Sequence, residues 1–310
     1  MKTCFLFPGQ GAQYPGMGKD LWEKSSEVKE IFRVAAESTG MDVEKLLFES
    51  SEDELKQTDK TQVAMTVVSL SAAAYLKDQG IEPEGFAGFS LGEYSALTEA
   101  GVIKLKDVFP LVKARGDIME DVSKNLNRGD GAPGMAAVIG LSFEKITEII
   151  EQAGIDGLYI ANYNSPTQIV LSGTAEGLEK GEPLCKEAGA KRYIRLKVSA
   201  PFHSPLLEPA KEEFAGVLKQ VGFNDPVKPV YSNVTAGRVT SGEEARELCI
   251  KQIVSTVRWV DEEKQLLDDG YERCLEAGPG KVLTGLWKAF DSTDVGCSPA
   301  GTAELIESIG

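Results

Sequence analysis

The stretch Phe86-Ala87-Gly88-Phe89-Ser90-Leu91-Gly92-Glu93-Tyr94-Ser95-Ala96-Leu97 is the most informative part of this chain. Its apolar and small residues at 86–89 predict a short strand, and the segment Gly92–Glu99 predicts a helix. Ser90 therefore stands at a sharp turn between the two, with a glycine two positions away on each side. This Gly-x-Ser-x-Gly pattern is typical of a nucleophile elbow, which exposes the serine hydroxyl at a helix N-terminus. The alternative is that Ser90 merely caps the helix.

A serine hydroxyl becomes a good nucleophile when a neighbouring base removes its proton, and imidazole is the usual base. The chain contains a single histidine, His203. Prolines at 201 and 205 surround it and predict a rigid loop instead of a helix face. If an imidazole activates Ser90, it is therefore that of His203; a structural or solvated histidine is the alternative. One histidine also argues against a zinc or iron site built on imidazole ligands.

Arg115 falls on the apolar side of a predicted helix from Asp107 to about Asn125, with Pro110 in its first turn. The residues three, four or seven positions from it are mostly apolar, and the charged residues of this segment lie on the opposite side. A buried guanidinium needs a partner because an unpaired buried charge is costly. That partner is either an internal Asp or Glu, or the carboxylate of a substrate held by two parallel hydrogen bonds.

The order of predicted elements indicates an α/β protein in two parts. Short buried strands alternate with helices in residues 1–130 and 198–310, which we expect to form a large domain. Residues 131–197 read strand, helix, strand, strand, helix, strand, which predicts a small ferredoxin-like domain inserted into the larger one. The expected boundary is the glycine-rich segment 127–134. A further strand is expected at 227–231, and the tail 291–310 predicts at most a short helix.

Composition excludes several classes of function. A net charge of −15 argues against nucleic-acid binding, which requires clustered cations. The five cysteines are widely spread and odd in number, which favours buried free thiols in a reducing compartment. The chain starts with too short an apolar run for a signal peptide, and it lacks the roughly 20 apolar residues that a membrane span needs. We expect a soluble, cytoplasmic protein without membrane contact.

Gln10 lies in the glycine-rich loop 8–13, directly after the first predicted strand. Loops at the carboxyl ends of strands line the crevice of open α/β sheets, so Gln10 is a candidate site residue; a tight surface turn is the alternative. The same loop lacks the last glycine of a dinucleotide fingerprint, and the segment 278–282 lacks the earlier glycine and the Ser or Thr of a P-loop. A nicotinamide cofactor or nucleotide hydrolysis is therefore not expected.

Taken together, these segments resemble the malonyl-CoA:acyl-carrier-protein transacylase family of bacterial fatty-acid synthesis. The resemblance covers the chain from about residue 5 to about residue 290, in the family's order. The matching segments are 7–13, 88–97, Arg115-Gly116 with Met119, 162–166, 201–203, Gln252 with Val257-Arg258-Trp259, and 276–283. It implies a hydrolase-like large domain with a mostly parallel sheet and a ferredoxin-like insert.

The resemblance also implies roles for individual residues. Ser90 would be the acylated nucleophile, and His203 its base, oriented by the main-chain carbonyl of Gln252. The backbone N–H groups of Gln10 and Leu91 would form the oxyanion hole. Arg115 would bind the carboxylate of the malonyl group. Asn162 would lie at the domain cleft beside the ligand.

The implied reaction transfers malonyl from malonyl-CoA to the phosphopantetheine thiol of acyl carrier protein, with no cofactor and no metal. The alternatives are loading of a polyketide carrier protein, a serine thioesterase or hydrolase, and a non-catalytic scaffold that retains the fold. We expect a monomer, and a local basic patch near Lys186, Lys191, Arg192 or Lys281 that receives the acidic carrier. One departure from the family is Phe89, where histidine commonly precedes the nucleophile.

Overall fold

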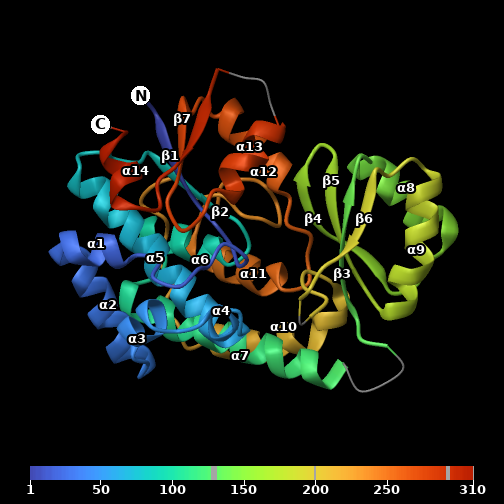
Figure 1. Ribbon diagram of the computed structural model, residues 1–310, viewed down its shortest axis with the longest axis horizontal. Helices are drawn as coiled ribbons and strands as arrows, with labels where there is room; N and C mark the ends of the chain where they lie inside the picture. The colour runs from blue at the N-terminus through green and yellow to red at the C-terminus, as the bar shows by residue number, and fades with distance from the viewer. Residues whose placement is uncertain (127–130, 199, 291–293, 310) are drawn as a thin grey trace.

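The computed structural model describes residues 1–126, 131–198, 200–290 and 294–309 (Figure 1). Its main sheet has the strand order β2-β1-β7-β8 and is parallel throughout. The strands are β1 (Thr3–Phe7), β2 (Gly85–Gly88), β7 (Arg273–Glu276) and β8 (Gly296–Pro299). Because both faces of a parallel sheet are covered by helices, such strands are short and apolar. Every residue of β1 and β2 is buried.

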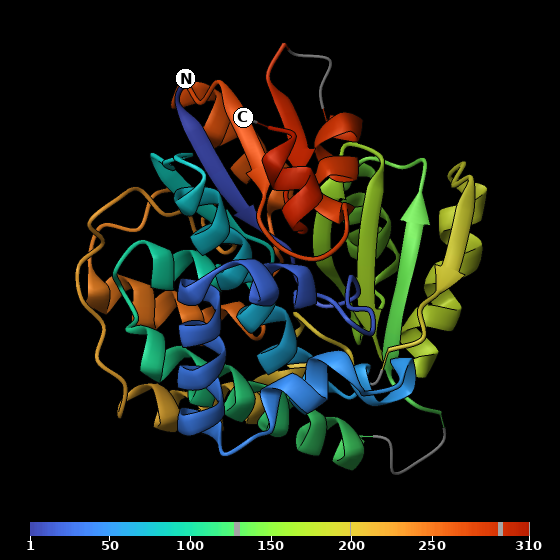
Figure 2. The ribbon, with the colours of Figure 1, turned by 60° about the vertical axis from the view of Figure 1, so that its left-hand side comes forward.

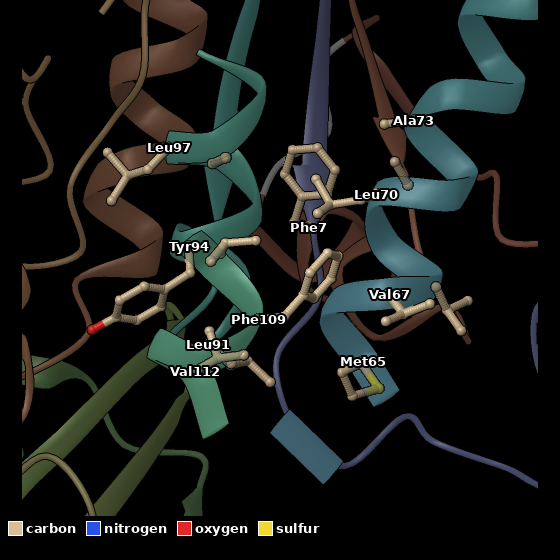
Figure 3. Close-up of a cluster of buried hydrophobic side chains, with 14 of the residues drawn as sticks. Phe7, Met65, Val67, Leu70, Ala73, Leu91, Tyr94, Leu97, Phe109 and Val112 are labelled. Carbon is tan, nitrogen blue, oxygen red and sulfur yellow. The ribbon is translucent and has the colours of Figure 1, made fainter. Parts of the chain in front are cut away.

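Helices cover both faces of the parallel sheet. Alternate residues of β1 point to opposite faces: Phe5 and Phe7 pack into the larger hydrophobic core, whereas Cys4 and Leu6 pack into a smaller one with Trp259. Figure 3 shows Phe7 among side chains of the helices of the larger core. The helices of this part are α1 (Lys19–Lys24), α2 (Ser26–Thr39), α3 (Val43–Phe48), α4 (Glu52–Leu55), α5 (Thr58–Asp78), α6 (Gly92–Glu99), α7 (Leu105–Leu126), α10 (Glu208–Leu218), α11 (Gly242–Gln252), α12 (Trp259–Asp268), α13 (Val282–Phe290) and α14 (Ala303–Glu307), with a 3₁₀ turn at Pro205–Leu207.

The second sheet is antiparallel and has the strand order β4-β5-β3-β6. It consists of β3 (Gly134–Ile139), β4 (Leu158–Ser165), β5 (Gln168–Gly173) and β6 (Arg192–Arg195), with α8 (Phe143–Ala153) and α9 (Ala175–Glu187) between them in the chain. The two helices pack on one face, and the other face turns toward the rest of the molecule (Figures 1 and 2). The order of elements is the ferredoxin-like one that the sequence predicts. Residues 127–130 of the expected boundary lie outside the described residues.

The two sheets are joined through the segment that follows α11. Val257 N–H donates to the carbonyl of Ala161 (2.9 Å), and Tyr163 N–H donates to the carbonyl of Val257 (2.9 Å). This short parallel bridge attaches β4 to the larger part beside Asn162. A residue of the antiparallel sheet is thereby fixed close to elements that carry the candidate site.

Three predictions about single elements are wrong. Pro110 lies inside α7 and not in its first turn, because the helix already begins at Leu105. The segment 227–231 forms only isolated bridges at Val230 and Tyr231, since prolines at 226 and 229 lack the N–H groups that a strand needs. The tail forms the expected short helix, α14, but it also contributes β8, an edge strand too short to show any alternation.

Candidate active site

Ser90 stands at the carboxyl end of β2 in a strained backbone conformation. Its φ of 52° is in the left-handed region, which a residue with a side chain rarely adopts. The flanking glycines permit the turn: a Cβ on Gly88 would lie 2.1 Å from the carbonyl carbon of Gly92, and one on Gly92 would lie 2.0 Å from the carbonyl oxygen of Phe7. Asn233 fixes the turn further, because its Oδ1 accepts from Ser90 N–H (2.6 Å) and its Nδ2 donates to the carbonyl of Gly88 (2.7 Å).

The imidazole of His203 lies directly against the Ser90 hydroxyl, with Nε2 2.7 Å from Oγ. The other ring nitrogen, Nδ1, is 2.9 Å from the main-chain carbonyl oxygen of Gln252. A carbonyl can only accept, so Nδ1 carries the proton and Nε2 is left as an acceptor for the serine hydroxyl. The pair is therefore oriented for removal of the Ser90 proton.

His203 is buried, which decides its protonation state. Burial, and next the positive charge of Arg115, lower the pKa of His203 to about 4. Hydrogen bonds from the ring to backbone groups of Gln252 and Ser255 act in the opposite direction. At neutral pH the ring is consequently uncharged and free to take up a proton, which is what a general base requires.

Arg115 reaches the same point from α7 and is only 2% exposed. Its Nη1 donates to Oε1 of Gln62 (3.0 Å) and its Nη2 to Oε1 of Gln252 (3.1 Å), while Nη2 lies 3.5 Å from Ser90 Oγ. Within the described ranges no carboxylate lies within 4.0 Å of the guanidinium, and its Nε has no hydrogen-bond partner. The internal salt bridge considered above is therefore wrong. A buried cation held by neutral amide oxygens is suited to bind an anion.

Two backbone N–H groups beside Ser90 have no acceptor among the described residues, those of Gln10 and Leu91. Both residues line the same cleft, and loop 8–13 packs tightly on the elbow. A Cβ on Gly9 would lie 2.7 Å from the carbonyl oxygen of Phe89. Unpaired N–H groups of this kind next to a nucleophile can stabilise an oxyanion.

These residues surround a cleft of about 630 Å³. Six of the seven predicted site residues line it, namely Gln10, Ser90, Leu91, Arg115, Asn162 and His203. The seventh, Gln252, is fully buried at the end of α11 behind them. Phe89 also lines the cleft, and its ring packs edge-on against Trp259 with centroids 5.5 Å apart. The walls thus combine an apolar surface with a few polar groups, as ligand sites commonly do.

Sequence reasoning missed three polar residues that hold the site together: Gln62, Glu93 and Asn233. Glu93 is buried in α6, and its Oε2 accepts from the side-chain Nε2 of Gln252 (2.5 Å). Burial raises the pKa of Glu93 to about 7. A carboxyl or amide inside an apolar helix is a detectable signal, and it was present for Gln62 and Glu93. Asn233 lies in an irregular loop with no pattern that could identify it.

The cations expected to receive a carrier protein lie outside the cleft lining. Lys186 is paired with Glu182 (2.6 Å), whereas Lys191, Arg192 and Lys281 are exposed and form no ion pair in the part of the chain described. All five cysteines are buried free thiols. None of the described helices combines the length and apolar character needed to cross a membrane. The described ranges also hold no group of three His, Cys, Asp or Glu side chains placed to bind a metal ion.

Comparison with known proteins places the chain. The family model of the acyl transferase domain matches residues 4–306. The malonyl CoA-acyl carrier protein transacylase of Bacillus subtilis (strain 168) is 41% identical over 93% of this chain and 90% of its own length. The crystal structure of an acyl carrier protein S-malonyltransferase from Vibrio cholerae superposes over 100% of both chains with a TM-score of 0.94 at 38% identity.

A third relative was solved with a partner bound. The malonyl-transacylase of a type II polyketide synthase, in complex with its acyl-carrier protein, has a TM-score of 0.92 at 34% identity and covers 99% of this chain and 98% of that one. The matches extend over both sheets, so the likeness concerns the whole molecule and not the elbow alone. The chain belongs to the malonyl-CoA:acyl-carrier-protein transacylase family of acyltransferases.

Proposed function

We propose that this protein transfers a malonyl group from malonyl-CoA to the phosphopantetheine thiol of an acyl carrier protein. The observation that carries the proposal is the meeting of Ser90, His203 and Arg115 at one cleft. Their atoms lie 2.7 Å (Ser90 Oγ to His203 Nε2) and 3.5 Å (Ser90 Oγ to Arg115 Nη2) apart. A nucleophile, a base and an unpaired cation in this arrangement fit a short acyl group that ends in a carboxylate.

In the first half-reaction Ser90 Oγ attacks the thioester carbonyl while His203 Nε2 takes the hydroxyl proton. The negative charge of the tetrahedral intermediate is stabilised by the N–H groups of Gln10 and Leu91. The carbon–sulfur bond then breaks, and His203 returns the proton to the departing coenzyme A sulfur. In the second half-reaction His203 takes the proton of the carrier thiol, whose sulfur displaces Ser90 from the malonyl carbonyl. The proton then goes back to Ser90.

Arg115 supports malonyl as the acyl group. A single methylene separates the carbonyl carbon of malonyl from its carboxylate, so an acyl group on Ser90 Oγ carries its anion only a few ångströms away. The guanidinium, 3.5 Å from Oγ, lies within that reach. An acetyl group has no anion to offer and would leave the buried cation unpaired, which disfavours it.

We further propose that the carrier protein docks on the cationic edge. It is defined here as Lys191, Arg192, Arg195 and Lys197, which lie directly before, within and after β6. All four side chains are exposed, and none forms an ion pair among the described residues. The edge runs to the mouth of the cleft, which Lys197 lines. In a chain of net charge −15, this group is a local site that could attract an acidic partner.

The remaining proposals concern context. We propose a role in fatty-acid synthesis, the pathway of the family that the sequence resembles. Loading of a polyketide carrier protein is the alternative, since a malonyl-transacylase of a polyketide synthase is 34% identical. The chain would act as a monomer without a cofactor. It would be cytoplasmic, because five buried free thiols are typical of a reducing compartment. Residues 1–130 and 198–310 would form the large domain, and residues 131–197 the insert.

The decisive experiment compares two fates of the malonyl group. The enzyme is incubated with malonyl-CoA and phosphopantetheinylated acyl carrier protein, and malonyl-carrier and free malonate are both measured. Malonyl-carrier should be the main product, and a carrier without its phosphopantetheine arm should accept nothing. Malonate as the main product would instead identify a hydrolase.

A further inference from the structure

A buried carboxylate lies directly behind the candidate site without touching the cleft. Glu93 is 1% exposed and follows Ser90 by three residues, in the first turn of α6. Its Oε2 accepts from Gln252 Nε2 (2.5 Å) and from the backbone N–H of Asn233 (3.2 Å). The acylation steps above make no use of this group, so its role needs an explanation.

The carboxylate of Glu93 and the carbonyl of Ser90 together determine which way the Gln252 amide points. Gln252 Nε2 donates to Glu93 and to the carbonyl of Ser90 (3.0 Å), both of which can only accept when Glu93 is ionised. The amide oxygen is therefore forced to the other side, where it accepts from Arg115 Nη2 (3.1 Å). If the amide were reversed, its NH₂ group would face the guanidinium and two donors would oppose each other.

Gln252 connects this amide to both functional side chains. Its side-chain oxygen holds Arg115, and its main-chain oxygen holds Nδ1 of His203 (2.9 Å). Gln252 is fully buried, and its side-chain oxygen is bonded to Arg115. A shift of this side chain therefore displaces the Arg115 guanidinium before it affects His203. The main chain, which lies at the end of α11, is less free to follow.

We propose that Glu93 is a positioning residue for acyl-group selection, which acts on Arg115 through the side chain of Gln252. This inference rests on the proposed malonyl transfer. The indirect link has a chemical advantage. A carboxylate in direct contact with Arg115 would compete with that of the substrate, whereas one beyond a neutral amide balances the charge of the guanidinium and leaves its free face open.

The chain offers a matched control in Glu263 on α12. Glu263 is also buried and also accepts one hydrogen bond from a side chain, Trp259 Nε1 (2.8 Å). It reaches the cleft only through the packing of that indole on Phe89, and it forms no hydrogen bond with Gln252 or Arg115 among the described residues. Methionine at either position removes the carboxyl group and approximates its volume. Any loss that comes merely from disturbing a buried acid should therefore appear in both variants.

The experiment measures kcat/KM for formation of the acyl-enzyme with malonyl-CoA and with acetyl-CoA at pH 8. For Glu93→Met the malonyl-to-acetyl ratio of kcat/KM should fall roughly 10- to 100-fold. This is the effect expected from the loss of one hydrogen bond to a charged group. Glu93→Gln retains an acceptor and should keep the ratio within about threefold of wild type. Glu263→Met should leave the ratio unchanged.

If Glu93→Met does not fold, Glu93→Asp replaces it, since the shorter side chain withdraws the carboxylate from Gln252 while its charge is kept. An unchanged ratio in either folded variant, or an equal fall in Glu263→Met, would overturn the proposal. A wild type that forms no acyl-enzyme with malonyl-CoA would refute the proposed function itself, so the two failures can be told apart.

Discussion

The parallel and antiparallel sheets contribute to the cleft in different ways. Ser90 follows β2 and Gln10 follows β1, so the carboxyl ends of two adjacent parallel strands bring the elbow and its N–H groups together. The antiparallel sheet provides Asn162 and Met135 as part of one wall, and its edge strand carries exposed cations. The nucleophile and the two N–H groups thus follow strands of the doubly covered parallel sheet, whereas His203 comes from the loop after β6 and Arg115 from α7. The cations proposed to receive the carrier lie on the antiparallel sheet.

This contrast separates the residues that carry out acylation from those that are proposed to bind the partner. Substitutions at the ends of the parallel strands and on the helices packed beside them should reduce the rate of acylation itself. Substitutions of the exposed cations on the edge strand of the antiparallel sheet should change how well a partner binds and leave acylation intact. Each prediction below tests one side of that division.

The largest effect is expected for His203→Ala, which removes the group 2.7 Å from the Ser90 hydroxyl. Without a base, acylation by malonyl-CoA should slow on the order of 10⁴-fold. Rapid-quench measurement of the acyl-enzyme gives this rate, and circular dichroism confirms that the variant is folded. A loss of less than about tenfold would show that His203 is not the base.

Arg115→Ala should have the next largest effect, and only for malonyl. Loss of a buried ion pair costs about 3–5 kcal/mol, so kcat/KM for malonyl-CoA should fall on the order of 10²- to 10⁴-fold. Acetyl transfer should survive. The control is Arg246→Ala, an arginine on α11 that stacks on Phe223 away from the cleft. Equal losses for malonyl and acetyl transfer would contradict the proposal that Arg115 binds the malonyl carboxylate.

The pH dependence of Ser90 reactivity tests whether His203 is buried as an uncharged base. A neutral probe makes this test independent of Arg115. Because burial lowers the pKa of His203 to about 4, the ring stays unprotonated, and therefore basic, well below neutrality. Labelling of Ser90 by a neutral fluorophosphonate should thus change little between pH 7.5 and 5.5. An exposed histidine, with its pKa near 6.5, would lose about tenfold over that interval. Such a loss would mean that His203 is not desolvated.

The smallest effect should come from the antiparallel sheet. Reversing two charges of the cationic edge, Arg192→Glu with Arg195→Glu, should raise KM for acyl carrier protein by roughly three- to tenfold and more at low salt. Acylation by malonyl-CoA should be unaffected. Lys180→Glu on α9, an exposed lysine already paired with Glu176, is the control. A fall in the acylation rate would break the division between the sheets.

Local patterns predicted much of this molecule. The strand, turn and helix around Ser90 are contiguous, so their periodicity and glycines were sufficient to place them. The ferredoxin-like order of residues 131–197 was equally readable, because its elements other than β6 have six or more residues and so show their period. The edge strand β8 has four residues and a proline, which is too little signal for any pattern.

The site was predictable only in part, for a related reason. Ser90, His203 and Arg115 carry chemistry that their residue types reveal. Asn233, by contrast, acts through hydrogen bonds to Ser90 and Gly88, which are 143 and 145 positions away. Only the folded backbone brings such pairs together. The lack of a carboxylate near Arg115 likewise depends on packing. From the sequence, an internal Asp or Glu and a substrate carboxylate were both possible partners.

The most direct test of the account is the intact mass of the protein after mixing with malonyl-CoA. Wild type should gain the mass of one malonyl group, and peptide mapping should place it on Ser90. Ser90→Ala should gain nothing, although its cleft keeps Arg115 and His203. A malonylated Ser90→Ala, or a wild type whose mass does not change, would contradict the claim that this serine carries the acyl group.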